Sequence, residues 1–326
     1  MKQRIAFLIG DPTGIGPEIT AACLAGRDPR PDTEYLLVGD ISSFRRAMDL
    51  TSSKLDFEQI EESQIGTVAG TFTFLDVPVE GDAPFGKVSA EAGAAVHAAI
   101  KMILSLIDRK LVDGFVFAPF NKEAMKLGGC PYSSELEMFK DHFNQHSVPG
   151  EINFADPMWT TRVTSHIAVK DIASFIKKDR IVESLRYLDQ EMRRFGRDSR
   201  KIAVSALNPH GGEKGLFGRE EIDEIEPAVA AARELGIDAH GPFPADTIFL
   251  RVRKGEYDAV VSMYHDQGQV ATKLLGFDKG VTVHGSMPVA IATCAHGTAF
   301  DIAGTGKASP NALNEAVKLV ESSLGA

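Results

Sequence analysis

The sequence predicts an α/β fold made of two lobes, and three observations lead to that prediction. The chain has 326 residues, 44% of them hydrophobic and 25% charged, which is too long for one small core and fits two packed lobes. Short apolar runs alternate with longer segments of helical pattern, as in parallel sheets covered by helices. The segment from Gly128 to Pro157 is irregular and rich in Gly, Pro, Asn and Ser, which is typical of a chain that passes from one lobe to another.

The expected strands are short runs of almost continuous apolar residues, as in sheets that are covered on both faces. They are residues 5–9, 35–38, 114–118, 202–206 and 259–263. The clearest helix is expected over residues 89–107, where Ser89 can cap the first turn. Within it, apolar residues recur at helical spacing: Ala92, Ala95, Val96, Ala99, Ile100, Ile103 and Leu106.

The composition argues against nucleic acid, membranes and disulfides. The formal net charge is -10, and no basic patch stands out that would displace counterions from DNA or RNA. The apolar run at residues 5–9 is too short for a secretion signal, and no window approaches the ~18 apolar residues that a membrane helix needs. The three cysteines, Cys23, Cys130 and Cys294, are odd in number and widely spaced, so a reducing, cytoplasmic location is expected.

The first expected strand runs into a turn rich in glycine and proline. Gly14 and Gly16 suggest a dinucleotide-binding loop, but Pro17 and Glu18 follow, and the third glycine of G-x-G-x-x-G is missing. Pro17 suits the first turn of a helix. Residues 10–19 therefore indicate either a functional loop or a plain turn between a strand and a helix.

Three histidines, His166, His210 and His265, each follow an apolar, strand-like segment. Residues just past the carboxyl ends of parallel strands line the functional crevice of such sheets. Three imidazoles suit Zn, Co or Ni, and Asp266 could orient a ring or bind the ion itself. Because the spacing matches no compact metal motif, each histidine could also be an ordinary surface or core residue.

The run from His296 to Ala308 is rich in glycine and other small residues. Such a run can bring backbone N–H groups close to a phosphate or a ring. The alternative is a glycine loop that only connects two elements.

Four stretches, in this order, carry a resemblance to a known family. The chain resembles the 4-hydroxythreonine-4-phosphate dehydrogenase (PdxA) family over nearly its whole length. The last stretch also resembles the adenine-side loop of isopropylmalate and isocitrate dehydrogenases, which share that family's fold. The stretches are Gly10-Asp11-Pro12-x-Gly14-Ile15-Gly16-Pro17-Glu18, Asn208-Pro209-His210-x-Gly212-Glu213, Tyr264-His265-Asp266-Gln267-Gly268 and His296-Gly297-Thr298-Ala299.

The resemblance implies a two-lobed α/β/α fold, with the active site in the interlobe cleft at the interface of a homodimer. Residues 1–127 and 278–326 would form the NAD-binding lobe, and residues 128–277 the lobe for metal, substrate and dimerisation. One divalent ion (Zn, Co, Mg, Mn or Ni) would bind His166, His210 and His265, with two ligands from one subunit and one from its partner. NAD would bind at His296, Gly297, Thr298, Ala299, Asp301 and Gly304.

The same resemblance supplies candidates for the chemistry. The ion would chelate the substrate hydroxyl and lower its pKa, a base would take the proton, and hydride would leave for the nicotinamide. Asp246, Asp266 and Lys273 are the candidate bases, and Lys273 also matches a substrate-binding lysine of the family. A carboxylate β to the new ketone would then be lost as CO2.

The chain departs from the family pattern at its predicted substrate positions. Where the family has Gly-His-Thr-Glu, this chain reads Ser134-Glu135-Leu136-Glu137. Glu135 replaces an imidazole donor with a carboxylate, and Leu136 replaces a hydroxyl with an apolar group. The family's substrate-binding Asn and Arg fall on Thr282 and Ile291, so a bidentate phosphate clamp is missing.

The function that we expect is NAD- and metal-dependent oxidation of a secondary alcohol of a hydroxy acid, with or without decarboxylation, in a pocket altered at the phosphate. The alternatives are a dehydrogenase for a phosphorylated hydroxy acid (4-phosphohydroxythreonine or phosphotetronate) and a cis-dihydrodiol dehydrogenase of aromatic carboxylates. A non-redox binding protein would not need all three histidines, and a zinc hydrolase would not need the glycine-rich loop.

Overall fold

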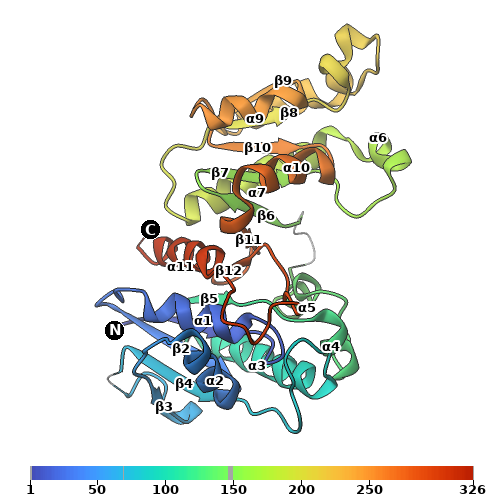
Figure 1. Ribbon diagram of the computed structural model, residues 1–326. Coiled ribbons are helices and arrows are strands. Elements are labelled where there is room, and N and C mark those ends of the chain that lie inside the picture. The colour runs from blue at the N-terminus through green and yellow to red at the C-terminus, as the bar shows by residue number, and fades with distance from the viewer. Residues whose placement is uncertain (1, 69, 146–149, 326) are drawn as a thin grey trace. The chain divides into compact units, whose positions relative to one another are not determined.

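The computed structural model describes residues 2–68, 70–145 and 150–325, and the chain divides into two compact units (Figure 1). Unit 1 is Met1–His146 with Met287–Gly325, and unit 2 is Ser147–Ser286. Both divisions fall later in the chain than the expected lobe boundaries. The reason is that α5 (Glu135–His142), which follows α4 (Lys122–Leu127), packs through Phe139 against Phe115 and Phe117 of unit 1. In the same way, β11 (Val281–Val283) pairs with a strand of unit 2.

Unit 1 is built on a parallel sheet with the strand order β3-β4-β2-β1-β5-β12. The strands expected at residues 5–9, 35–38 and 114–118 are confirmed as β1, β2 and β5, whereas β3, β4 and β12 were not expected. The strands are β1 (Gln3–Leu8), β2 (Thr33–Gly39), β3 (Glu58–Gln59), β4 (Phe72–Asp76), β5 (Gly114–Phe117) and β12 (Ala290–Cys294). The helices are α1 (Gly16–Ala25), α2 (Ile41–Thr51), α3 (Ala90–Asp108), α4, α5 (Glu135–His142) and α11 (Asn311–Ser323), with a 3-10 turn at Glu62–Gln64.

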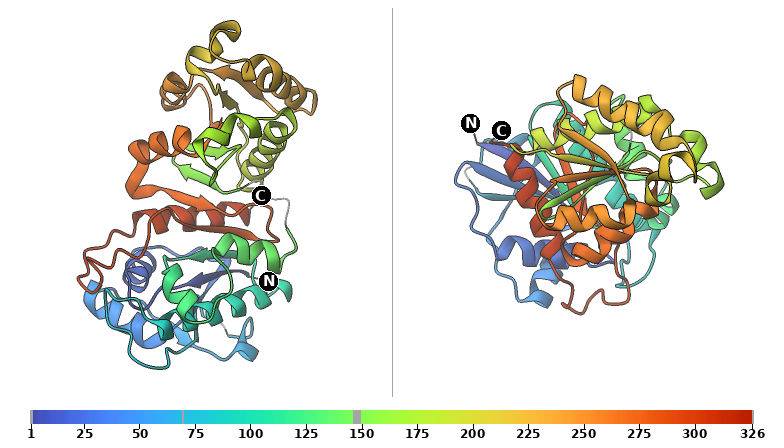
Figure 2. Two further views of the ribbon diagram at one scale, coloured as in Figure 1. Left: turned by 90° about the vertical axis from the view of Figure 1, so that its right-hand side faces the viewer. Right: turned by 90° about the horizontal axis from the view of Figure 1, so that it is seen from above.

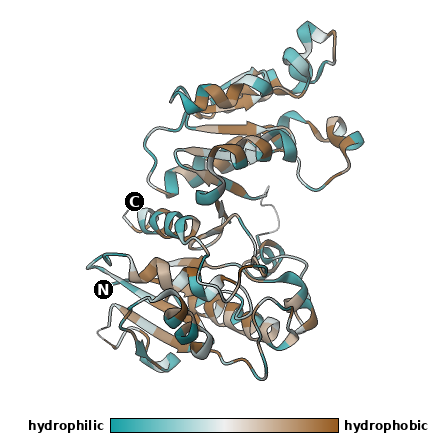
Figure 3. Cartoon of the chain, viewed as in Figure 1, coloured by the Kyte–Doolittle hydropathy of each residue, from teal (hydrophilic) through white to brown (hydrophobic). Residues whose placement is uncertain are grey.

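Helix α3 confirms the clearest helix prediction. Its N-cap is Ser89, whose hydroxyl accepts a hydrogen bond from the Ala92 N–H at 3.1 Å. The side chains of Val96, Ile100 and Ile103 are buried in the core of unit 1, as their helical spacing predicted. In Figure 3, hydrophobic colours recur along several helices and strands of each unit.

The expectation that no segment is apolar enough to cross a membrane was wrong for α3. Its 19 residues are long and apolar enough to do so by length and composition. However, half of that apolar window is buried, and α3 packs against β1, β2 and α4. These contacts are those of a core helix in unit 1.

Unit 2 is built on a mixed sheet with the strand order β11-β6-β7-β10-β8-β9. Figure 2 shows the helices of unit 2 on both sides of this sheet. The pairs β11–β6 and β6–β7 are antiparallel, whereas β7, β10, β8 and β9 run parallel. The strands are β6 (Ile152–Ala155), β7 (Met158–Arg162), β8 (Ile202–Ser205), β9 (Ala239–Phe243), β10 (Ala259–Ser262) and β11. The helices are α6 (Ile172–Phe175), α7 (Lys178–Arg194), α8 (Glu226–Glu234), α9 (Ala245–Arg253) and α10 (His265–Gly276), with shorter helical turns at Val169–Asp171, Pro209–Gly215, Glu221–Ile225 and Phe277–Lys279.

The packing of α3 against α4 yields a first test. A Cβ at Gly93 would lie 1.9 Å from the carbonyl oxygen of Ala124. We therefore expect Gly93→Ala to destabilise the protein by at least about 2 kcal/mol through overpacking, although Ala is normally the better helix former. Thermal unfolding measures the effect. Gly297→Ala in the same unit is the control, because nothing lies within 4 Å of its Cβ position. Equal melting temperatures for the two variants would contradict this account of the packing.

Candidate active site

The strand order of unit 2 brings the turns that carry the three histidines to one edge of the sheet. Strands β7, β10 and β8 are parallel neighbours. His166 follows β7, His265 follows β10 and His210 follows β8. The ring centroids of His166 and His265 lie 5.9 Å apart, so the structure brings two of the three predicted ligands together.

The pair His166 and His265 suits a divalent metal ion. Nδ1 of His265 lies 2.6 Å from the Asp266 carboxylate, which favours the tautomer whose Nε2 is free to bind metal. A zinc ion sits about 2.0–2.1 Å from each ligating nitrogen, and both rings are partly or fully exposed toward solvent. Asp266 is thus placed to orient the ring of His265, one of the roles expected for it.

His210 is not gathered with the other two. Across residues 2–68, 70–145 and 150–325, no group of three His, Cys, Asp or Glu side chains is placed to hold a metal ion. His210 begins a run of left-handed backbone that continues to Gly215, with φ of 53° at His210 and 41° at Glu213. Non-glycine residues adopt this conformation at a cost of roughly 1–2 kcal/mol each, and such strain gathers at functional sites.

Two side chains that the sequence reasoning did not single out fix the turns around these histidines. Gln267 accepts a hydrogen bond from the Met263 N–H and donates one to the Ala206 carbonyl, both at 2.7 Å. It thereby links the end of β10 to the end of β8. Glu221 is buried and accepts the backbone N–H groups of Leu207 and Asn208 at 2.8 Å. A sequence shows neither link, because both join residues far apart in the chain.

The other two candidate bases are exposed on helices of the same unit. Asp246 lies in the first turn of α9. Lys273 lies on α10, eight residues beyond His265, which is about 12 Å along a helix axis. Lys273 and His265 are thus separated by about two turns of the same helix.

In unit 1, the turn after β1 supports the glycine-rich loop that the resemblance assigns to NAD. Glu18 is buried, and its carboxylate accepts the N–H groups of Gly304 at 2.5 Å and Gly306 at 2.9 Å. The N–H of Ile15 donates to the carbonyl of Thr298 at 3.1 Å. The turn is thus more than a plain connection. Since Glu18 uses the N–H of Gly304, this glycine serves the loop's shape.

The remaining predicted cofactor residues lie on the same loop. Gly297 and Asp301 are exposed, and His296 is half-buried with Nδ1 at 3.1 Å from the Gly297 carbonyl. Ala299 has a φ of 41°, so the chain turns sharply there. This loop offers exposed polar groups beside the turn of residues 10–16.

A buried carboxylate also holds the turn itself. Asp11 accepts the N–H and the hydroxyl of Thr13, at 2.9 and 2.7 Å. Burial raises the pKa of Asp11 above its ordinary value, while the hydrogen bonds from Thr13 and from the Asn121 N–H oppose the rise. The three cysteines take no part in this region: they are free and buried, and burial raises the pKa of Cys23 and of Cys294 to about 12.

The two predicted substrate residues of α5 point into different surroundings. Glu135 forms an ion pair with Lys122 at 3.1 Å, so a cation faces the carboxylate that departs from the family pattern. Leu136 lines an open pocket of about 460 Å³. The pocket's other lining residues are Tyr132, Ser134, Glu137, Lys140 and Asp141.

The other two predicted substrate positions differ in exposure. Thr282 lies on β11, and its hydroxyl accepts a hydrogen bond from the Asn153 amide at 3.3 Å. Ile291 lies on β12 and has no exposed surface. The side chain of Ile291 therefore packs in the core of unit 1.

Known proteins share this fold. A β-decarboxylating dehydrogenase of Thermococcus kodakarensis has a TM-score of 0.51 to this chain, at 16% identity over 99% of this chain and 84% of that one. The class is thus the two-unit α/β fold of the isocitrate and isopropylmalate dehydrogenase type, as the sequence predicted. The family model described as "Pyridoxal phosphate biosynthetic protein PdxA" matches residues 32–320. The chain belongs to the PdxA family.

Relatives that match this chain over nearly its whole length are named dehydrogenases. The 4-hydroxythreonine-4-phosphate dehydrogenase of Geobacter metallireducens is 38% identical over 97% of this chain and 94% of its own. The D-threonate 4-phosphate dehydrogenase of Pectobacterium atrosepticum is 35% identical over 98% of both chains. The crystal structure of the Klebsiella pneumoniae 4-hydroxythreonine-4-phosphate dehydrogenase has a TM-score of 0.82 at 34% identity, over 98% of this chain and 99% of that one. This protein is an enzyme, a dehydrogenase that acts on a CH–OH group with a nicotinamide cofactor.

The anchoring of the glycine-rich loop by Glu18 can be tested directly. In Glu18→Gln, the amide NH2 would face one of the two N–H donors, and a charge-assisted hydrogen bond contributes roughly 1.5–3 kcal/mol. We expect the affinity for the nicotinamide cofactor to fall about tenfold or more, as measured by calorimetry on folded protein. Glu91→Gln, at an exposed carboxylate on α3, serves as the control. Unchanged cofactor affinity in Glu18→Gln would show that the loop keeps its shape without this carboxylate.

Proposed function

We propose that this enzyme uses NAD and one divalent metal ion to oxidise the secondary alcohol of a small hydroxy acid. The observation that carries the proposal is the pair of neighbouring imidazoles, His166 and His265, with Asp266 on the Nδ1 of His265. A dehydrogenase has use for such a pair because a bound divalent ion lowers the pKa of an alcohol, and NAD then accepts the hydride.

The protein's own residues hold the reacting groups and move the proton. Asp266 fixes the ring of His265, and the left-handed turn after β8 presents His210. Since Asp266 is engaged with His265, the role of base falls to Asp246 or Lys273, which are both exposed. Hydride transfer requires the alcohol and the nicotinamide to meet, so the histidines of unit 2 and the glycine-rich loop of unit 1 serve one reaction.

We further propose that the working enzyme is a cytoplasmic homodimer in which His210 completes the metal site of the partner. Two observations support this arrangement of the metal site. The chain gathers two of the three histidines, and the His210 turn is followed by Leu216 and Phe217, which are 71% and 51% exposed. Large apolar side chains beside a strained, exposed histidine suit an interface. The free, buried cysteines accord with a reducing compartment.

The substrate is the point at which this chain departs from its relatives. Their names favour a phosphorylated hydroxy acid over a cis-dihydrodiol or a non-redox role. In this chain, however, Glu135 pairs with Lys122, and Ile291 is buried and uncharged. Lys273 is the exposed cation that remains among the predicted substrate residues. We therefore propose that the pocket prefers a hydroxy acid without a phosphate ester.

The metal site is tested with single histidine variants. We expect His210→Ala to abolish turnover and to lower zinc affinity by at least about 10- to 100-fold, as loss of support at metal sites does. His240→Ala in the same unit should behave as wild type, because His240 lies on β9 and pairs with Asp238 instead. Metal content and NAD reduction are measured after stripping and reloading with zinc. Full activity of a metal-stripped His210→Ala protein would defeat the metal proposal.

The substrate proposal predicts that phosphorylated 4-hydroxythreonine is a poor substrate. Without one or two charge-assisted hydrogen bonds, phosphate binding should weaken by about ten- to several-thousand-fold. The test compares kcat/KM of the wild type with that of Glu135→His, Leu136→Thr, which restores donors and frees Lys122. Ile291 is left unchanged, because an arginine there would bury a charge. Glu123→Gln, beside Lys122, is the control. A wild-type kcat/KM above roughly 10⁴ M⁻¹s⁻¹, ordinary for a native substrate, would refute the prediction.

A further inference from the structure

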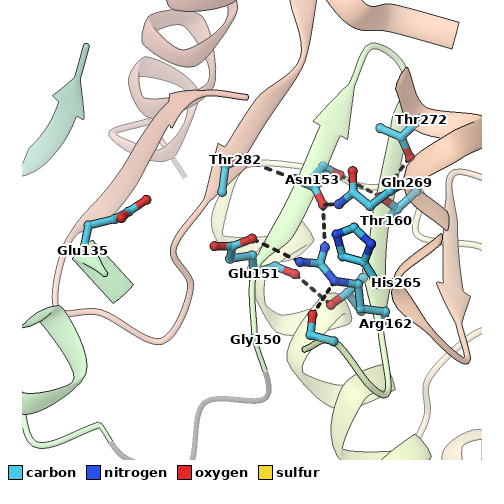
Figure 4. A network of polar contacts seen from close by, with 12 residues as sticks. Glu135, Gly150, Glu151, Asn153, Thr160, Arg162, His265, Gln269, Thr272 and Thr282 are labelled. Atoms are coloured by element: carbon cyan, nitrogen blue, oxygen red, sulfur yellow. Dashed lines mark hydrogen bonds and ion pairs between the residues drawn. The ribbon is translucent and has the colours of Figure 1, made fainter. Parts of the chain in front are cut away.

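A buried arginine stands at the end of β7, four residues before His166. Arg162 is 6% exposed. It donates from Nε to the Ser165 hydroxyl at 2.7 Å, from Nη1 to the Asn153 amide oxygen at 2.8 Å and from Nη2 to the Glu151 carboxylate at 3.1 Å (Figure 4). We call this residue and its polar neighbours the Arg162 cluster. Its members are Arg162, Glu151, Asn153, Gln269 and Thr282.

The Arg162 cluster joins the elements of unit 2 that carry site residues. Ser165 directly precedes His166, so the arginine holds the turn of one imidazole. Gln269 lies on α10, the helix that begins at His265, and donates to the same Asn153 oxygen as Arg162. Asn153 in turn donates to Thr282, a predicted substrate position. Figure 4 shows the hydrogen bonds that join Arg162, Asn153, Gln269 and Thr282.

A structural role alone does not account for this cluster. Burying an ion pair costs several kcal/mol of desolvation per ion, and apolar side chains of the same volume hold strands together as well or better. Glu151 opens the cluster toward solvent, since 29% of its side chain is exposed. Of the five N–H donors of an arginine, three are used in the hydrogen bonds above. One donor on each terminal nitrogen remains, and these two suit the two oxygens of a planar acid group.

The charges of the predicted site residues also favour a carboxylate ligand. The predicted substrate positions Glu135 and Ile291 supply no cation, whereas Arg162 places one beside Thr282 and next to the turn of His166. The Arg162–Glu151 pair has no net charge, and Glu151 repels any anion that approaches the guanidinium. This repulsion is smaller for a singly charged carboxylate than for a doubly charged phosphate.

We propose that Arg162 binds the carboxylate of the substrate, so that the substrate is a hydroxy acid whose acid group lies close to the alcohol held at His166 and His265. This inference rests on the proposed function and deepens it. Glu151 and Asn153 orient the guanidinium, and Thr282 bounds the same site. Arg162 is then the residue that distinguishes a hydroxy acid from its neutral analogues.

The test measures acid preference. The probes are D-threonate, L-threonate and malate, each against its neutral amide, with zinc- and NAD-loaded protein. We expect Arg162→Met to raise KM for the preferred acid by about 10- to 100-fold, the range for a lost charge-assisted hydrogen bond, with less change in kcat and none in KM for the amide. Arg162→Lys should recover part of the acid preference. Arg180→Met is the matched control, because Arg180 contacts the same turn at the Val163 carbonyl.

A second variant separates binding from folding. Arg162→Met alone leaves Glu151 without this cation, which can destabilise the unit. Arg162→Met, Glu151→Met removes both charges and should fold, keep its zinc and still lack acid preference. Recovery of acid preference in the double variant would show that the pair is only structural, and would overturn the proposal.

Measurements on the wild type and the two Met variants distinguish a failure of the proposed function from a failure of the proposed role of Arg162. A wild type that reduces NAD with none of the probes refutes the proposed function. Thermal shifts by each acid and its amide still test Arg162, because they need no turnover. A wild type stabilised equally by acids and amides, or by neither, overturns the role of Arg162. A shift by the acids that disappears in both Met variants supports it.

Discussion

The hydrogen bonds that hold β7, β10 and β8 as parallel neighbours are the constraint on which the rest of the site depends. Because parallel strands end on the same side of a sheet, the three turns that follow them must emerge together. The register aligns Ser262 with Arg162, and His265 and His166 follow three and four residues later. Gln267 then ties the turn after β10 to the end of β8. The histidines are thus positioned by the backbone of the sheet, and side chains only refine their places.

Buried carboxylates hold the functional loops in both units. Glu18 accepts two N–H groups of the glycine-rich loop, Glu221 accepts two at the start of the His210 turn, and Asp11 closes the turn after β1. A charged acceptor makes stronger bonds to backbone N–H groups than a neutral one. This arrangement lets glycine-rich segments, which lose much entropy on ordering, keep one conformation without a hydrophobic core of their own.

The sequence predicts the parts of this structure that depend on local pattern. Apolar runs located β1, β2, β5, β8 and β10, and the cap and spacing of residues 89–107 located α3. It did not predict the Arg162 cluster, because β7 carries polar residues where an interior strand is normally apolar, and their partners lie on β6, α10 and β11. Nor could it show that Ile291 is buried on β12 or that Glu135 faces Lys122, because both facts depend on contacts between segments distant in the chain.

Two charged residues, Glu135 and Arg162, share one electrostatic feature. Glu135 is matched by Lys122, and Arg162 is matched by Glu151. Each pair is close to neutral, so each recognises shape and hydrogen bonding more than net charge. A site that gains its specificity from a clamp of unpaired cations favours the most highly charged ligand, such as a phosphate ester. A site built from a neutral pair discriminates by the geometry of its donors, and a planar carboxylate beside an alcohol satisfies that geometry with less repulsion from Glu151 than a phosphate ester would meet. In the proposed role of Arg162, the cation that binds the acid group lies in unit 2, on the strand that precedes His166. The preference for a ligand can therefore change while the histidines that would hold the metal ion stay in place.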